Sequence, residues 1–472
     1  MVSVKKLFKS AGVYFLGNVL TRLISFFLLP LYTSYLATND MGYYDVSTTY
    51  LNILVPVICL EIWSGIMRFM FDFTDKNDKY KVIFNGMVIF SGSVAIYTIL
   101  FVALGIVKDI DCIVFIFFYG VLMMLQNIYT FVARGLGYNQ VFAVSGIVSS
   151  LVNSVSNIIM ILLLNMRLES LYIAMIIGLI VQLIILELKV KIISNISFKM
   201  FDFEMIKSMA KFSVPLCLNS ACFWFLSSYN KIGIKNTLGL DANGIYSVAG
   251  KFTMAVAIVA NCFSLAWQEM VYSIGNQEEN KSKLYTTALN YCVTLLMFGE
   301  LLIIPFVNVI FPYFVDSAYN EAYRYVPLYM FATAMSTLSS FLGNIFGAEK
   351  KTNVIFYSTV VAAIVNVGVF HLFVGNFGLE AANIGLSLGY VINIILRIII
   401  LNKSYTIKID YLKIAILILI HIPVYYVYLQ LGLLENIITF FAVSIVMLFM
   451  FKDTLKMFFN KISGNKKLRH KD

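Results

Sequence analysis

The sequence predicts an all-α protein that crosses a membrane many times, and three observations carry that prediction. Apolar residues make up 60% of the 472 residues and charged residues only 13%, against about 25% charged in a typical soluble chain. The mean hydropathy is +0.85, which leaves too little polar surface to cover a water-soluble protein of this size. Apolar runs long enough to cross a bilayer, about 20 residues each, recur along the whole chain.

Walking along the chain, we expect about fourteen transmembrane helices. The first apolar run follows Lys5, Lys6 and Lys9, exceeds the length of a signal-peptide core and precedes no small-residue cleavage site, so it predicts a retained span. The longest gap between runs, residues 191–209, could not hold a soluble catalytic domain. In order, the predicted spans are residues 10–36, 43–69, 82–107, 112–133, 139–164, 168–190, 210–237, 244–273, 285–311, 324–347, 353–374, 378–401, 411–430 and 433–451.

The basic residues orient these spans. With the N-terminus in the cytoplasm, the inner segments and the C-terminal tail hold 26 of the 35 lysines and arginines, the outer loops hold 3, and 6 lie within spans. Cytoplasmic loops are the ones enriched in lysine and arginine. We therefore expect a multi-pass protein with both termini in the cytoplasm, and the net charge of +10 needs no nucleic-acid partner.

Neither the cysteines nor the histidines suggest a metal or redox site. The six cysteines fall almost wholly within apolar runs and lack C-x-x-C spacing, and the three histidines are scattered. The chain contains no G-x-x-x-x-G-K-[ST] motif for a nucleotide phosphate. We therefore expect no disulfide, no metal and no cofactor.

An internal duplication organises the chain. Residues 36–46 and 238–248 share Leu, Gly, Tyr and Val at a constant offset of 202, and both segments are outer turns between two spans. Six spans separate the copies, so the two halves have the same orientation, as in transporters built from parallel repeats. We expect a six-helix lobe in residues 1–202, a second in 203–404, and two extra helices with a basic cytoplasmic tail in 405–472.

Six basic residues fall within the predicted spans. Arg68, Lys235 and Arg397 lie near span ends, where long side chains reach the interface. Arg22, Lys231 and Lys251 lie deeper, where each charge costs about 2.5–3.5 kcal/mol even on the lenient insertion scale. A wet central cavity between the two lobes would remove most of that cost, so we expect these three residues to face it.

Polar side chains at helical spacing support the same cavity. One face of the first span carries Tyr14, Asn18, Thr21, Arg22 and Ser25; the seventh span carries Ser220, Trp224, Ser227, Ser228 and Lys231; the second carries Asp45, Thr49 and Asn52. From these faces we select Asn18, Ser25, Ser227, Thr49 and Asn52 as polar lumen residues. Small polar residues also hold helices together, an explanation that stays open for the serines and threonines but does not account for the cations.

Cations inside a cavity imply an anionic cargo. Phosphate is the best match, because arginine and lysine both bind it well. The acidic residues within spans are fewer, and Glu61, Glu300 and Asp45 are the candidates for coupling transport to an ion. Pairing with a nearby cation is the alternative role for each of them.

The opening of the chain resembles the polysaccharide-exporter branch of the MOP superfamily. The residues that carry the resemblance are Gly17-Asn18, Arg22, Leu29-Pro30-Leu31-Tyr32, Gly42-Tyr43-Tyr44 and Arg68-Phe69. In particular, the chain is similar to the Wzx-type flippases that move repeat units of O-antigen, of capsule or of exopolysaccharide. The similarity extends to the whole chain through its fourteen spans and two six-span lobes.

This resemblance implies the cargo, the mechanism and the partners. The cargo would be an undecaprenyl-diphosphate-linked oligosaccharide, moved by alternating access from the cytoplasmic to the outer leaflet of the bacterial plasma (inner) membrane, as a precursor of the O-antigen of lipopolysaccharide, of capsule or of exopolysaccharide. The cationic lumen would consist of Arg22, Lys231 and Lys251, with Arg68 as a further candidate. Partners would be this substrate, membrane lipids and other polysaccharide assembly proteins, and the expected state is a monomer that works as a secondary-type transporter without a cofactor.

Three other functions stay open at this point. A lipid II flippase of peptidoglycan synthesis would also have fourteen spans and a basic cavity. A cation-coupled multidrug exporter of the related MATE group would have twelve spans and acidic lumen residues, which fits the deep cations poorly. A membrane enzyme is suggested by Asp109-Ile-Asp111, the D-x-D pattern of many glycosyltransferases, but that tripeptide lies in a short outer loop.

Overall fold

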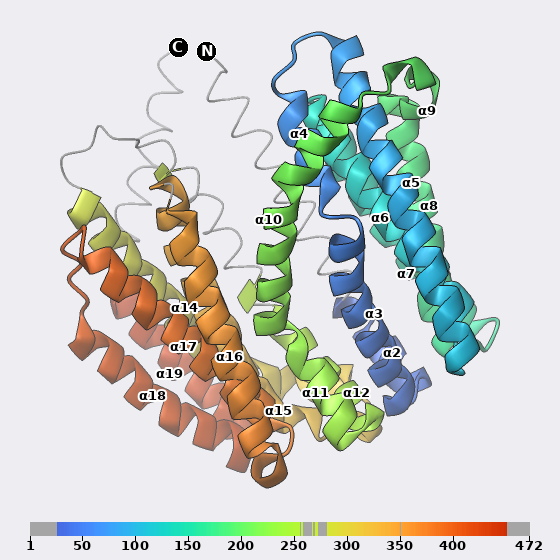
Figure 1. Cartoon of the computed structure of the whole chain (residues 1–472). Helices are drawn as coiled ribbons and strands as arrows, with labels where there is room; N and C mark the ends of the chain where they lie inside the picture. The colour runs from blue at the N-terminus through green and yellow to red at the C-terminus, as the bar shows by residue number, and fades with distance from the viewer. Residues whose placement is uncertain are drawn as a thin grey trace, which may run out of the picture.

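The computed structural model describes residues 26–254, 256–257, 267, 270–271, 281–349 and 351–450. Within these ranges the secondary structure is helical throughout and contains no strand. Figure 1 shows the helices of the first half of the sequence beside those of the second half, with α10 running between them. The prediction of an all-α, multi-pass membrane protein is confirmed.

The first half contributes a series of long helices and three short elements. These are α2 (Leu29–Tyr35), α3 (Thr38–Ile58), α4 (Ile62–Met70), α5 (Lys76–Val107), α6 (Ile113–Gly135), α7 (Asn139–Leu162), α8 (Leu168–Val190), α9 (Ile192–Asn195) and the 3₁₀ turn η1 (Phe198–Met200). The remainder of the chain supplies α10 (Phe203–Ser227), α11 (Tyr229–Leu238), α12 (Leu240–Phe252), α14 (Lys281–Phe314), the 3₁₀ turn η2 (Ser317–Tyr319), α15 (Ala322–Ala348), α16 (Thr352–Phe377), α17 (Glu380–Asn402), α18 (Tyr411–Gln430) and α19 (Leu433–Met450).

The count of spans can be compared with the fourteen expected. In the described part of the chain, nine helices are long and apolar enough to cross a membrane, or ten if the bent pair α3 and α4 counts as one span. The first predicted span lies mostly, and the eighth partly, outside the described residues. Helix α15 is not among these nine, because its serines and threonines lower its mean hydropathy. Helix α19 is apolar but shorter than the nine. Fourteen therefore stays a prediction.

Two of the predicted spans are broken helices. Between α3 and α4, Leu60 and Glu61 adopt left-handed backbone angles, φ +51° and +50°, and the two helices bend by 49°. Such angles cost a non-glycine residue of order 1 kcal/mol or more. Pro56, inside the last turn of α3, weakens the helix just before this point because it has no N–H to donate. The other break is at Ser228, between α10 and α11.

Helix α10 begins where it does because Asp202 caps it. The carboxylate of Asp202 accepts a hydrogen bond from the backbone N–H of Met205 at 3.1 Å, and such caps satisfy donors that have no partner within the helix. Lys81 at the start of α5 pairs with the same carboxylate at 2.8 Å. The hydrogen bond from Lys81 holds the pKa of Asp202 below its usual value.

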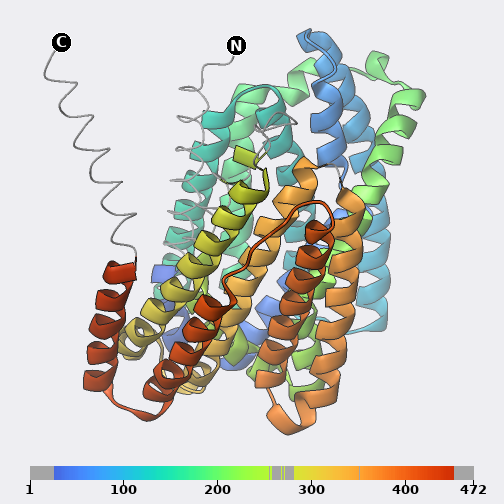
Figure 2. The ribbon, with the colours of Figure 1, turned by 90° about the vertical axis from the view of Figure 1, so that its left-hand side faces the viewer.

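Two buried apolar cores lie in the described structure. One is built from side chains between Leu51 and Met209, and the other mainly from side chains between Leu226 and Val443. Figure 2 shows α18 and α19 lying on the outside of the second group, beside α14. The boundaries expected at residues 202 and 404 stay a prediction.

Helices near the start of each half contact the other half, although α10 also packs against α16 of its own half. Thr33 in α2 donates a hydrogen bond from Oγ1 to the carbonyl oxygen of Phe314 at 3.3 Å, and Tyr319 donates to the carbonyl oxygen of Leu36 at 3.0 Å. In the opposite direction, α10 packs against α3, α4 and α5, where Phe212 and Phe69 make an edge contact. Each half thus holds the end of a helix that the sequence assigns to the other.

The duplicated glycines meet where α3 crosses α12. A Cβ atom added to Gly42 would overlap the carbonyl oxygen of Leu240, and one added to Gly244 would overlap that of Thr38. These four residues form two pairs at the offset of 202 seen in the sequence. The contact is therefore symmetric, and two backbones approach this closely only where neither residue has a side chain. We call this crossing the closed end; it is at the bottom of Figure 1.

Substituting Gly42 by alanine should force the closed end apart, because the obstacle is backbone that cannot rotate away. Thr38 donates a hydrogen bond to Asp241 across the same crossing, so a cysteine pair at these positions reports the contact in a cysteine-free background. We expect Gly42→Ala to lower disulfide cross-linking of this pair several-fold. Gly92→Ala is the control, since a Cβ on Gly92 meets open space. Unchanged cross-linking in Gly42→Ala would contradict the assignment.

Candidate functional site between the two halves

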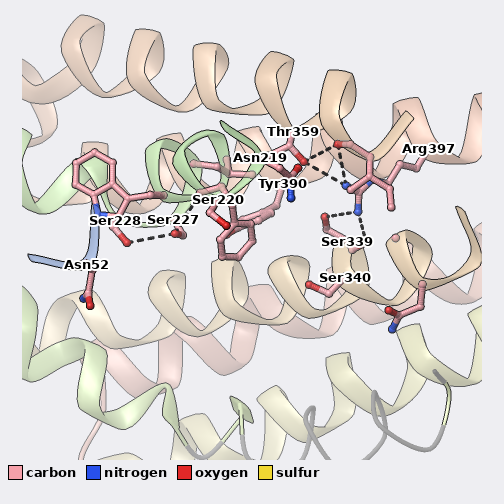
Figure 3. A pocket seen from close by; sticks show the side chains of 16 residues that line it. Asn52, Asn219, Ser220, Ser227, Ser228, Ser339, Ser340, Thr359, Tyr390 and Arg397 are labelled. Carbon is pink, nitrogen blue, oxygen red and sulfur yellow. Dashed lines mark hydrogen bonds between the residues drawn. The ribbon is translucent and has the colours of Figure 1, made fainter. Parts of the chain in front are cut away.

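A cavity of about 610 Å³ lies between α3 on one side and α10, α15, α16 and α17 on the other. Figure 3 shows its lining, which is rich in hydroxyl and amide groups. The lining residues are Asn52, Asn219, Ser220, Phe223, Trp224, Leu226, Ser227, Ser228, Ser339, Ser340, Gly343, Asn344, Ile355, Thr359, Tyr390 and Arg397. A polar chamber inside an apolar helix bundle is the kind of space that can hold a polar or charged cargo.

Helix α10 contributes the largest share of this lining because its polar residues follow helical spacing. Ser220, Trp224, Ser227 and Ser228 all reach the cavity. Ser227 donates to the carbonyl oxygen of Phe223 and lies 3.2 Å from the hydroxyl of Ser228. From the first half, Asn52 reaches the cavity as an exposed side chain.

Arg397 is a cavity residue that sequence reasoning placed wrongly. It was expected to extend toward the interface from the end of its span, but its side chain is buried, with 3% of the residue exposed. Its guanidinium donates to the carbonyl oxygen of Ser339 at 2.5 Å, to Ser358 at 3.0 Å and to Thr359 at 3.3 Å. Among the described residues it makes no ion pair with a carboxylate, so its positive charge remains beside the cavity.

A sequence signal for this position exists. Ser339, Ser358 and Thr359 interrupt two neighbouring apolar runs at a depth that matches Arg397. A lone arginine near a span end suggests an interfacial side chain, whereas an arginine at the level of hydroxyls on two adjacent spans suggests a buried hydrogen-bonded clamp. The clamp ties α15, α16 and α17 together at the cavity wall.

One of the predicted deep lysines, Lys231, forms an ion pair with Asp45, a candidate for ion coupling, and this pair joins the two halves. The Lys231 ammonium in α11 lies 2.7 Å from Oδ1 of Asp45 in α3. The side chains are 26% and 14% exposed, respectively, so the pair is only partly solvated. Asn243 donates to the other oxygen of Asp45 at 3.2 Å, which satisfies a charge in a place where an unpaired one would be costly.

Lys251 completes this charged group. It lies close enough to interact with the Asp45 carboxylate by attraction and with Lys231 by repulsion. No hydrogen bond from its ammonium to another described residue is present. Two lysines and one carboxylate leave one net positive charge among the described members of this group, which we call the basic cluster: Asp45, Lys231 and Lys251.

The basic cluster lies between the cavity and the closed end. Lys231 follows Ser228, a lining residue, by three positions, and Asp45 precedes Asn52 by two helical turns. Between them, the indole N–H of Trp224 donates to the carbonyl oxygen of Thr49 at 3.0 Å. The side chain of Thr49 is buried and donates to the carbonyl oxygen of Asp45, so Thr49 contributes to packing rather than to the cavity wall.

Glu61 stands at the break between α3 and α4. Its carboxylate accepts hydrogen bonds from Ser220 at 2.6 Å and from Ser64 at 3.3 Å. Because Ser220 also lines the cavity, a carboxylate at a backbone hinge is connected to the cavity wall by one hydrogen bond. A role for Glu61 in ion coupling stays a prediction.

The remaining candidates lie elsewhere. Arg68 pairs with Asp72 one turn along the same exposed helix end, at 2.5 Å, and the structure does not bring it to the basic cluster. Glu300 faces α18 rather than the cavity. Arg22, Asn18 and Ser25 lie outside the described residues.

Arg397→Lys should lower the melting temperature of the purified protein by several degrees, because one ammonium cannot reach both hydroxyls on α16 and the carbonyl oxygen on α15. Hydrogen bonds to a charged group contribute about 1.5–3 kcal/mol each. Arg68→Lys is the matched control, since an exposed pair one turn apart contributes at most about 0.5 kcal/mol. Equal melting temperatures for both variants in detergent would show that Arg397 is not a clamp.

Comparisons with known proteins agree with this architecture. Residues 7–267 match a family model described as "Polysaccharide biosynthesis protein". A search of curated proteins gave no significant match. Among solved structures, the lipid II flippase MurJ in an inward closed conformation superposes with a TM-score of 0.70 at 14% identity, covering 94% of this chain and 99% of MurJ. An inward-facing multidrug resistance MATE family transporter of the MOP superfamily gives 0.64 at 16% identity, covering 80% and 92%.

At these identities the solved structures show a shared fold, and the resemblance expected from the opening residues is confirmed by the family match together with the MOP neighbours. The family model covers more than half of the chain. The protein therefore belongs to the polysaccharide biosynthesis protein family, with the fold of MOP-superfamily flippases and transporters.

Proposed function

We propose that the protein is a flippase that moves undecaprenyl-diphosphate-linked oligosaccharide from the cytoplasmic to the outer leaflet of a bacterial plasma membrane. The observation that carries the proposal is the polar cavity between the halves with the basic cluster at its closed end. The family match supports a polysaccharide pathway, and the fold neighbours are a lipid flippase and a transporter. The reaction is transport rather than catalysis, as the repeat unit of O-antigen, capsule or exopolysaccharide would cross unchanged.

The orientation of the chain gives the cavity its direction. The positive-inside pattern supports a cytoplasmic location for both termini, and the crossing of α3 with α12 would then lie at the outer face. The described conformation would accept cargo from the cytoplasmic side. Export would require the closed end to separate, which means parting Gly42 from Gly244 and Asp45 from Lys231.

The basic cluster offers a way for the cargo to cause that separation. A diphosphate carries more negative charge than one carboxylate and accepts hydrogen bonds from several cations at once. In the cavity, it would compete with Asp45 for Lys231 while Lys251 and Arg22 add attraction. Exchange of one anion for another keeps Lys231 paired with a negative charge, since leaving it unpaired would cost several kcal/mol.

This proposal predicts which substitutions stop transport. Lys231→Ala, Lys251→Ala and Arg22→Ala should each lower flipping about tenfold or more, the loss expected for one charged hydrogen bond to phosphate. The assay uses purified protein in liposomes containing lipid-linked oligosaccharide, and a membrane-impermeant reagent detects its arrival in the outer leaflet. Lys235→Ala is the control on the same helix, since Lys235 lies over the ring of Tyr50 at 5.7 Å, apart from the basic cluster. Normal transport in all three variants would refute the proposed binding role.

A charge swap separates cargo binding from closure. In the double variant Asp45→Lys with Lys231→Asp, the ion pair across the halves is restored but the cations change position. We expect cross-linking between cysteines at Thr38 and Asp241 to persist while flipping is lost. Recovery of flipping would show that the ion pair only holds the two halves together and that the position of the lysine does not affect cargo binding.

Two alternative cargoes give distinct results in the same liposomes. Movement of lipid II in preference to lipid-linked oligosaccharide would favour a lipid II flippase, the activity named for the MurJ neighbour. Cation-driven efflux of a soluble cationic dye, with no lipid movement, would favour drug export as named for the MATE neighbour.

We expect the protein to act as a monomer, alongside other polysaccharide assembly proteins.

A further inference from the structure

Away from the cavity, α14 and α18 enclose an acidic side chain that the transport proposal does not use. Glu300 has no exposed surface, and it faces His421 and Tyr425 on α18. Oε2 of Glu300 lies 3.5 Å from Nε2 of His421, which is 7% exposed. A buried carboxylate and a buried imidazole in contact raise the question of where the protons are.

The imidazole ring answers part of this question. Nδ1 of His421 lies 2.8 Å from the carbonyl oxygen of Leu417. A carbonyl oxygen can only accept, so Nδ1 must carry a hydrogen. If His421 is neutral, Nε2 then carries no hydrogen, and its lone pair points toward the carboxylate of Glu300. Neither Nε2 nor Oε2 has a hydrogen-bond partner among the described residues.

Tyr425 does not resolve the conflict between these two acceptors. Its hydroxyl lies 2.7 Å from Oε1 of Glu300 and 2.9 Å from the carbonyl oxygen of Pro327 on α15. The hydroxyl has one hydrogen, which can satisfy Oε1 or the carbonyl but leaves Oε2 facing Nε2. An ionised Glu300 beside a neutral His421 would therefore leave two buried acceptors in contact, at a cost of the kind that unpaired buried charges carry.

The charged and titratable groups on the packed elements favour an added proton. On α17, Glu380 interacts electrostatically with Tyr425, and Arg324 on α15 is near Glu380. Tyr323 on α15 is hydrogen-bonded to Tyr428 and Asn308, one turn from Tyr425. On α19 the described charged residue is Glu435, which is exposed in the first turn. No described lysine or arginine contacts Glu300.

We propose that Glu300, His421 and Tyr425 form a proton-binding site in which one proton is shared by the carboxylate and the imidazole and holds α18 against α14. Whether the proton is on Oε2 of Glu300 or on Nε2 of His421, the two side chains together are neutral. The atom that carries the proton donates a hydrogen bond, and the other atom accepts it. Without it, the contact between the C-terminal helix pair and the second core is weakened. The site itself does not depend on the identity of the cargo; its influence on transport rests on the proposed flippase function.

The direct test observes His421. The chain has only three histidines, so ¹⁵N-histidine labelling with His421→Gln for assignment gives a simple solid-state NMR spectrum in lipid. At pH 7 we expect Nε2 of His421 to be protonated or hydrogen-bonded to a protonated Glu300. In Glu300→Gln, the amide donates to Nε2 and the ring becomes a plain neutral tautomer. A neutral ring beside an ionised Glu300 in the native protein, seen by ¹³C-glutamate labelling, would overturn the proposal.

The dependence of the protein's stability on pH provides an independent test of the proposed proton site. Above about pH 6.5, an unfolded chain has both groups deprotonated, so the native state would hold one proton more, and the unfolding constant should rise about tenfold per pH unit. The apparent melting temperature of the wild type should fall between pH 6.5 and 9.

Variants isolate the cause of this fall. Glu300→Gln should remove the pH dependence above pH 6.5, whereas the exposed control Glu435→Gln should keep it. If Glu300→Gln does not fold, Tyr425→Phe serves instead. Its melting temperature should fall at a higher pH than that of the wild type, because the hydroxyl of Tyr425 donates to the carboxylate of Glu300 and its loss favours the protonated form. Parallel profiles for the wild type and Glu300→Gln would overturn the proposal. Unchanged flipping in Glu300→Gln, with the expected NMR signature in the wild type, would count against the transport link alone.

Discussion

The need to pair every charge that enters the membrane-spanning helices is the constraint on which the rest of this structure depends. Hydrocarbon offers no water to a guanidinium, an ammonium or a carboxylate. The chain meets this requirement differently at each depth. Arg397 donates to hydroxyls and carbonyls of two neighbouring helices, Lys231 pairs with Asp45 of the other half, and Glu300 contacts His421 and Tyr425. Each solution fixes a different pair of neighbouring helices.

Much of the fold could be predicted because bilayer thickness and hydropathy act on one helix at a time. The predicted runs coincide with helices wherever the structure describes them, and the offset that joins Gly42 to Gly244 appears in space as a symmetric contact. The breaks at Glu61 and Ser228 were not predicted, since both lie within continuous apolar or mixed segments. Backbone angles there depend on neighbours far away in sequence, such as Ser220 against Glu61.

The candidate site was only partly accessible from the sequence for a related reason. Spacing along one helix identifies a polar face, as for Ser220, Trp224 and Ser227, but it does not say which face meets which. Depth alone made Lys231 and Asp45 separate candidates for binding and coupling, whereas the structure makes them one ion pair. Arg397 looked interfacial for the same reason, because its hydroxyl partners belong to other spans.

The contacts of α2 and α10 with the opposite half have a mechanical consequence. The end of α2 is held by the backbone of Phe314 and Asp316 and by the hydroxyl of Tyr319, and α10 packs against α3, α4 and α5 as well as against α16. The loop near residue 202 is therefore not the only connection between the halves. A rotation of one half relative to the other must carry these helices with it or slide along them, so the contacts that join the halves also limit the directions in which they can move.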